Sequence, residues 1–210
     1  MMQTDQLIAQ LAGEPAPKAA ASPWRLSLRW LAFLTFYAAM VMAFSSARPD
    51  LLTALQQPFF ALEILLLAGI VISAVLSAAL MSFPDLHQKR LLTFVPIFFF
   101  AAFAGVMVAA LLADPSSSRE AGKGMQCLSC ISAYAVLPAL LLLRAIARMA
   151  TTRGASAGML ALLCAFAVGA LLIRLREPTE SIMHVMVWHY APMLVVALIG
   201  LVLGRRLLRW

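Results

Sequence analysis

Residues 59–80 read FFALEILLLAGIVISAVLSAAL, and this stretch decides the fold class of the chain. It holds a single charged side chain, Glu63. A helix needs about 20 mostly apolar residues to cross a bilayer, so the stretch predicts a transmembrane helix. Five further windows of the same character predict five more helices, at residues 30–46, 91–112, 131–146, 158–173 and 186–203.

The composition of the whole chain agrees with this prediction. Of the 210 residues, 63% are hydrophobic and 12% are charged, and the mean hydropathy is +0.93. A soluble domain is nearer half apolar and a quarter charged, and too few polar residues are present here to cover a water-soluble globule. We therefore predict an all-α polytopic membrane protein, with residues 29–210 as a six-helix transmembrane domain.

The lysine and arginine positions orient the predicted helices. Six spans place both termini on one side, and cytoplasmic loops carry an excess of basic residues. With cytoplasmic termini, the inner basic residues are Lys18, Arg25, Arg29, Lys89, Arg90, Arg144, Arg148, Arg153, Arg205, Arg206 and Arg209, and the outer ones are Arg48, Arg119, Lys123, Arg174 and Arg176. The imbalance predicts cytoplasmic N- and C-termini. The excess of basic residues, which gives the chain a net charge of +7, then faces anionic membrane lipid on the cytoplasmic side. It does not indicate direct nucleic-acid binding, since no basic run alternates with aromatic residues.

Residues 1–28 form a separate region, predicted to be a cytoplasmic helix and tether. In TDQLIAQLAGE, the side chains of Leu7, Ile8 and Leu11 fall on one helical face. The following PAPKAAASP is typical of a flexible linker. The polar face carries Asp5 and glutamines rather than lysine, which favours a protein partner over the alternative of an interfacial helix lying on lipid.

Two of the three cysteines stand in GMQCLSC, in the loop that we predict on the periplasmic face between the third and fourth spans. The C-x-x-C spacing of Cys127 and Cys130 permits a disulfide, a thiolate metal site, or both at different times. Two thiols do not fill a tetrahedral metal site, so further ligands are needed.

Candidate ligands lie at the start of the last span, in SIMHVMVWHYAPM. Met186, His189 and Met193 follow at steps of three and four residues and are predicted to share one helical stripe. His184 lies five residues before His189 and is predicted to point elsewhere, although it stays a candidate. Thioether, imidazole and thiolate ligands suit a soft ion; copper, cadmium or zinc is the expected signal, and no cofactor is expected to be obligatory. The alternative is core packing, because methionine fills gaps in apolar cores.

Glu63 is predicted about one turn inside the periplasmic end of its span. A carboxylate at that depth is costly unless it is paired or functional. Arg48 and Arg174 are predicted at the same membrane face. The sequence therefore leaves two roles open for Glu63, an ion pair or a metal ligand.

The remaining motifs carry no catalytic chemistry, and we predict that the chain is not an enzyme. Cys164 stands alone in an apolar span as a small hydrophobic residue. GASAG at residues 154–158 matches G-x-S-x-G, but it opens a helix rather than following a strand. Small residues at four-residue spacing, such as Gly200 and Gly204, predict close helix packing, and a homodimer through these two glycines stays open.

The chain end VMVWHYAPMLVVALIGLVLGRRLLRW resembles the C-terminus of the NrsF family, the negative regulators of sigma-F. TDQLIAQLA, PWRLSLRW, RPDL and GMQCLSCI also match the pattern of this family. The resemblance covers essentially the whole chain, including the six spans.

The resemblance implies a bacterial inner-membrane anti-sigma factor. Members hold an extracytoplasmic-function sigma factor through a short cytoplasmic N-terminus and release it when heavy metal or oxidative stress acts on periplasmic cysteines. Cys127 fits the family's cysteine in the third outer loop. The segment around Leu7, Ile8 and Leu11 fits the sigma-binding segment.

The chain departs from the family pattern in its last outer loop. Members often carry a second cysteine before a proline, where this chain has Arg176-Glu177-Pro178. Either Cys130 substitutes as the partner of Cys127, or Glu177 acts as an oxygen ligand.

The hypothesis is that Cys127 and Cys130, with His189 and Glu63, bind metal or become oxidised and thereby shift the bundle. A membrane thiol oxidoreductase is one alternative, but it generally needs a second cysteine pair. A soft-metal transporter is the other, but the fourth and fifth spans hold almost no polar groups.

Overall fold

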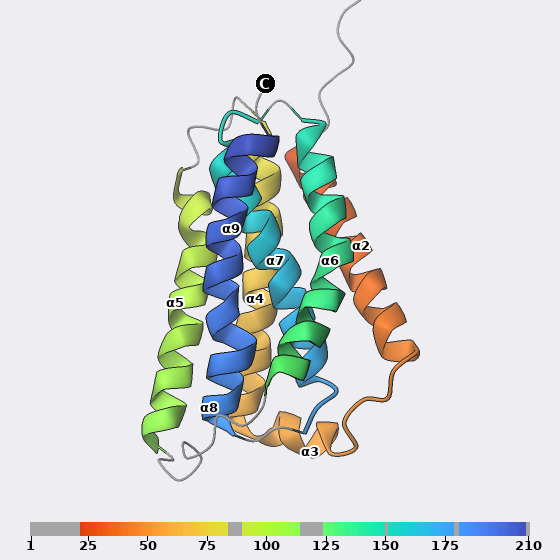
Figure 1. The fold of residues 1–210 in the computed structure, drawn as a ribbon, viewed down its shortest axis with the longest axis vertical. Coiled ribbons are helices and arrows are strands. Elements are labelled where there is room, and N and C mark those ends of the chain that lie inside the picture. Colours follow the sequence, from red (N-terminus) through yellow and green to blue (C-terminus); the bar gives the residue numbers. More distant parts are fainter. Residues whose placement is uncertain (1–21, 84–89, 114–123, 150, 179–180, 209–210) are drawn as a thin grey trace, which may run out of the picture.

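The computed structural model describes residues 22–83, 90–113, 124–149, 151–178 and 181–208 (Figure 1). Within these ranges the elements are α2 (Pro23–Ala43), α3 (Leu51–Gln56), α4 (Pro58–Met81), α5 (Arg90–Ala113), α6 (Met125–Ala147), α7 (Gly154–Arg174), α8 (Ile182–His184), the π-helix η3 (Val185–Tyr190) and α9 (Ala191–Leu207). Six of the described helical segments, with α8, η3 and α9 counted as one, are long and apolar enough to cross a membrane. The all-α fold with six spans is confirmed.

Several helices begin earlier than the hydropathy of the sequence predicts. α2 begins at Pro23 rather than at residue 30, and α6 begins at Met125 rather than at residue 131. Hydropathy measures the transfer of side chains into lipid, so a span predicted from it ends where polar side chains begin. The backbone hydrogen bonds of the helix continue beyond that point into the membrane–water interface. The placement of Cys127 and Cys130 in a loop is therefore wrong, since both lie in the first turns of α6.

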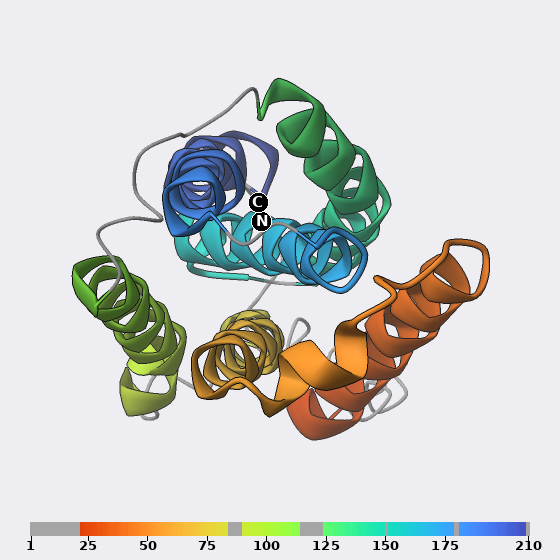
Figure 2. The same cartoon turned by 90° about the horizontal axis from the view of Figure 1, so that it is seen from below.

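α7 is the central helix of the bundle. Of its most apolar window, 83% is buried, against 17% for α2 and 22% for α5. Figure 2 shows α7 between α9, α6 and α4, and α2 also contacts it. A helix that is apolar on all sides is stable only when other helices or lipid surround it, and here other helices do so.

The outer faces of the surrounding helices are apolar. Large side chains such as Phe36, Leu65, Phe98 and Leu198 are each more than 60% exposed in the isolated chain. Apolar surface distributed over so many helices needs a hydrocarbon environment, because water would leave it uncovered.

Glycine contacts hold α7 and α9 together. A Cβ atom on Gly158 would lie 2.5 Å from the carbonyl oxygen of Gly200, and one on Gly200 would lie 2.6 Å from that of Gly158. Gly204 meets the backbone of Gly154 in the same way. Such contact lets two backbones approach closely in a membrane. Gly200 and Gly204 are thus buried inside one chain and offer no face for a homodimer.

The two ends of the bundle carry different elements. The start of α2 and the end of α9 lie at one end, and α3, α8 and the start of α6 lie at the other (Figure 1). α4 has 24 residues, which at 1.5 Å per residue is about 36 Å, enough to cross a hydrocarbon core of about 30 Å. Cys127 therefore lies across the bundle from Pro23. The assignment of the Pro23 end to the cytoplasm stays a prediction.

Candidate metal centre

The last span begins with a capped turn and continues as a π-helix. The Ser181 hydroxyl oxygen accepts a hydrogen bond of 3.3 Å from the backbone N–H of His184, which caps α8. Within η3 the hydrogen bonds reach back five residues, as the N–H of Ala191 donates to the carbonyl of Met186. π-helical turns are rare and are often found at functional sites.

A proline lies just after the widened turn. Pro192 has no N–H to donate to the carbonyl of Trp188, and in an α-helix its ring would press against that carbonyl. η3 ends at Tyr190, two residues before Pro192, so the irregular turn lies directly beside this proline.

The π turn brings His184 and His189 together. In a regular α-helix, residues five apart are separated by about 140° around the axis. Here the two rings form an edge contact, with centroids 5.4 Å apart and an interplanar angle of 79°. The prediction that His184 points away from His189 is wrong, because it assumed α-helical spacing through residues that form a π-helix.

Small residues position the start of α6 beside this π turn. Gly124 precedes α6, and a Cβ atom there would overlap the indole ring of Trp188. Ile131 lies one turn beyond Cys127 in α6. A Cβ atom on Gly169 of α7 would lie 2.5 Å from the carbonyl oxygen of Ile131. These contacts hold the first turns of α6 against both η3 and α7.

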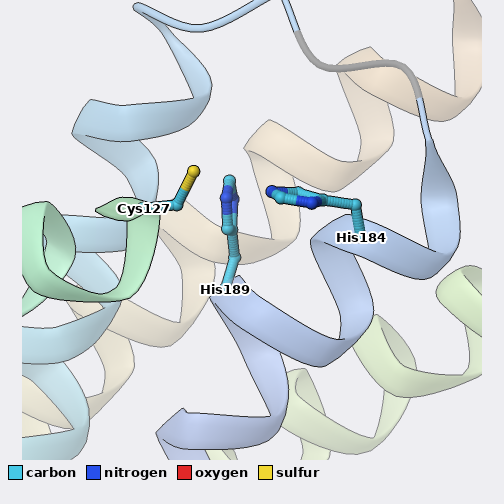
Figure 3. Close-up of side chains that lie close together, drawn as sticks. All are labelled: Cys127, His184 and His189. Atoms are coloured by element: carbon cyan, nitrogen blue, oxygen red, sulfur yellow. The ribbon is translucent and has the colours of Figure 1, made fainter. Parts of the chain in front are cut away.

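Cys127, His184 and His189 converge as a result (Figure 3). The Cys127 sulfur and one ring nitrogen of each histidine all lie within 4.8 Å of one another. Figure 3 shows the His189 ring between the other two side chains. One thiolate and two imidazoles are ligands that proteins use for zinc and related metals.

His189 is the buried member of the group whose polar atoms lack partners. Its side chain is 0% exposed, and neither Nδ1 nor Nε2 has a hydrogen-bond partner among the described residues. Buried polar groups are nearly always paired, and an unsatisfied one costs about 1–3 kcal/mol. Either nitrogen of this buried ring is therefore able to bind a ligand.

The Cys127 thiol contacts Glu177 rather than its neighbouring cysteine. Its Sγ donates to Oε2 of Glu177 at 3.2 Å. The backbone N–H of Glu177 donates to the carbonyl of Ile173 at 2.8 Å, which fixes Glu177 at the end of α7. Cys130 is not in a disulfide, packs partly buried against the apolar core, and lies outside the group. The sequence left Cys130 and Glu177 as alternatives to the second cysteine of the family. Glu177 is the one whose side chain contacts Cys127.

Glu63 lies in a separate buried ion pair. Its Oε1 accepts a 2.6 Å hydrogen bond from Nε of Arg174, and its Oε2 accepts one of 2.8 Å from Nη2. The Tyr190 hydroxyl also donates to Oε1. Arg48 instead pairs with Asp50 at 2.6 Å, and this guanidinium lowers the pKa of the Asp50 carboxyl. Of the two roles that the sequence left open for Glu63, the structure shows the ion pair. Glu63 does not belong to the group of Cys127, His184 and His189.

The side chains of Met186, Met193 and Cys164 lie in or against the apolar core. Met186 is partly buried against the core and Met193 is 0% exposed within it. Cys164 is 1% exposed, and its thiol lies 3.8 Å from the carbonyl oxygen of Val71. The proposed stripe of Met186, His189 and Met193 relied on α-helical spacing, which η3 interrupts.

The predicted sigma-binding residues Asp5, Leu7, Ile8 and Leu11 lie outside the described part of the chain. Their role stays a prediction.

The fold and this site define a class of protein, a polytopic all-helical membrane protein with one thiol and two imidazoles brought together at one end of the bundle. The family model described as negative regulator of sigma F (NrsF) matches residues 11–210. The chain is also 33% identical over 221 residues to the anti-sigma-F factor NrsF of Caulobacter vibrioides (strain NA1000 / CB15N), with 100% of each chain covered. The chain belongs to the NrsF family. No solved structure matches it.

Proposed function

We propose that this chain is a bacterial inner-membrane anti-sigma factor with a periplasmic thiol sensor. It binds an extracytoplasmic-function sigma factor through residues 1–28 and releases it when heavy metal or an oxidant reaches Cys127. Membership of a family of negative regulators of sigma F supports the regulatory role. The convergence of Cys127, His184 and His189, across the bundle from Pro23, carries the sensing role.

The distribution of arginines supports the orientation. Seven exposed arginines lie at the end of the bundle that holds the start of α2 and the end of α9: Arg25, Arg29, Arg144, Arg148, Arg153, Arg205 and Arg206. At the Cys127 end, Arg48 and Arg174 are buried in ion pairs. Exposed basic residues favour the cytoplasmic face, where anionic lipids are concentrated, so we assign the Cys127 end to the periplasm.

The sensor is suited to moving helices because its side chains come from different spans. Cys127 lies on α6, and both histidines lie on the last span. A ligand that draws them together shifts α6 relative to α9, and packed helices move between discrete arrangements. Changing a population from 1:99 to 99:1 requires about 5.5 kcal/mol of differential binding. A site with several strong metal ligands is able to supply this free energy, whereas a weak oxygen site is not.

The proposal is tested by sigma-dependent reporter transcription in cells that express the chain at matched levels. The wild-type chain is expected to repress the reporter and to release repression when Cd²⁺ is added. Cys127→Ser is expected to repress but not to respond to Cd²⁺, while Cys130→Ser, the matched thiol control, responds as wild type.

Removal of residues 1–22 tests the sigma-binding region in the same assay. The shortened chain begins at Pro23, the first residue of α2, so every helix of the bundle is kept. We expect constitutive transcription and loss of sigma co-purification from detergent. Normal induction of Cys127→Ser would disprove the sensing role, and retained sigma binding by the shortened chain would disprove the binding region.

A further inference from the structure

We infer that Cys127, His184 and His189 form a site for one divalent cation of the zinc, cobalt and cadmium class. This inference rests on the proposed function, since it names the ligands and the chemical class of the signal. It also changes the ligand set expected from the sequence, because Cys130, Glu63 and Met186 are not part of it.

The distances suit a site that closes around a cation. Tetrahedral coordination with bonds of 2.0–2.3 Å separates ligand atoms by about 3.3–3.8 Å. The three donor atoms already lie within 4.8 Å of one another, so a contraction of about 1 Å completes the geometry. Both nitrogens of the His189 ring are buried and lack partners among the described residues, so one of them is available as a donor.

The fold assembles this ligand set from two helices. His184 and His189 are adjacent only because η3 is a π-helix. Cys127 reaches them because Gly124 lets α6 approach Trp188. The packing that brings the donors together is thus already present in the folded chain.

The kinds of donor select the class of cation. Calcium and magnesium need six or more oxygen ligands, which this group lacks. Two imidazoles and one thiolate suit zinc and cobalt, and the thiolate also suits the softer cadmium. Cu(I) prefers sets dominated by sulfur, and Met186 is instead packed against the apolar core.

Binding requires the Cys127 thiol to lose its proton. The S–H bond breaks as the bond between sulfur and metal forms. The proton is transferred to Oε2 of Glu177, which already accepts the thiol hydrogen bond at 3.2 Å, and it then leaves to solvent. The thiolate charge partly neutralises the cation beside the buried ring of His189.

The test uses Co²⁺ as a spectroscopic probe of the full-length chain, purified in detergent together with its sigma factor. We expect one Co²⁺ per chain, with the intense visible bands of tetrahedral cobalt and a thiolate-to-cobalt charge-transfer band. Zn²⁺ and Cd²⁺ should displace the cobalt. Cys127→Ser should remove the charge-transfer band, and Cys130→Ser should leave it unchanged.

The histidines are tested by His189→Asn and His184→Asn. Each is expected to weaken Co²⁺ binding at least about 100-fold, since even residues that only support metal ligands are worth 10- to 100-fold. Retention of the sigma factor and monodisperse elution show that a variant is folded. If one histidine variant fails this control, the other decides.

Two results would overturn the inference. One is the absence of tetrahedral bands in wild type at excess Co²⁺. The other is a charge-transfer band that survives in Cys127→Ser and is lost in Cys130→Ser. Sigma co-purification is scored on the same samples before any metal is added, so loss of cobalt binding by a chain that had retained sigma rejects this site alone. Failure of the wild-type chain to co-purify with sigma in metal-free buffer rejects the proposed function itself.

Discussion

Two polar groups are buried at the same end of the bundle, and they differ in how their hydrogen bonds are satisfied. In the ion pair, both carboxylate oxygens of Glu63 accept hydrogen bonds, from Arg174 and Tyr190. In the other group, the buried ring of His189 has no hydrogen-bond partner among the described residues. Tyr190 and His189 are consecutive residues of η3, so the two groups are directly connected.

This difference separates a polar group with a structural role from the group that we propose binds a cation. A buried charge network stabilises a fold when every member is satisfied, and breaking it leaves an uncompensated charge. An unsatisfied buried ring reduces stability until a ligand binds it. Substitutions in the Glu63 ion pair should therefore lower the stability of the fold with or without metal. Substitutions in the Cys127 group should lower it mainly when metal is present.

The largest expected effect is on the ion pair. Glu63→Ala removes the carboxylate that pairs with the buried Arg174 guanidinium and is expected to destabilise the chain by about 3–5 kcal/mol. The double variant Glu63→Leu with Arg174→Met should recover most of this loss, since it removes both charges. Thermal unfolding of the purified chain in detergent measures both. A loss below about 1 kcal/mol in Glu63→Ala would show that the pair is not structurally important.

A smaller effect is expected where α6 meets η3. In Gly124→Ala the new methyl group overlaps the Trp188 ring, so either the start of α6 with Cys127, or Trp188 beside His189, must shift. We expect Co²⁺ affinity to fall about 10-fold, or about 1.4 kcal/mol, while the ion pair is unaffected. Gly105→Ala is the matched control, because nothing lies within 4 Å of the added atom. Equal affinities in the two variants would show that this contact does not position Cys127.

The smallest expected effect on stability concerns His189. In metal-free protein, His189→Leu replaces an unsatisfied polar ring with an apolar side chain, and stability should stay equal or rise by about 1 kcal/mol. Added Zn²⁺ should stabilise the wild-type chain against heat but not this variant. Thermal unfolding with and without Zn²⁺ tests both points. A clear destabilisation in metal-free buffer would indicate that His189 makes favourable polar contacts without a ligand.

The sequence predicted the fold class through quantities that are local to each span. Residues 59–80 are apolar enough to cross a bilayer by themselves, and the same reasoning finds the other five spans. It also singled out Cys127 and both histidines as ligand candidates. The polar turns at residues 23–29 and 125–130 were excluded from helices because hydropathy measures transfer into lipid, not backbone hydrogen bonding.

Tertiary structure alone decided which polar residues meet. Glu63 had two arginines within reach in the sequence-based topology, and helix rotation selected Arg174. Cys127 had two candidate partners, and the end of α7 placed Glu177 beside it. His184 joined the group only because η3 departs from α-helical spacing. Crossing a membrane depends on the summed hydrophobicity of one segment, so sequence determines it. Contacts between spans depend on how each helix rotates and packs against its neighbours, which only the assembled bundle determines.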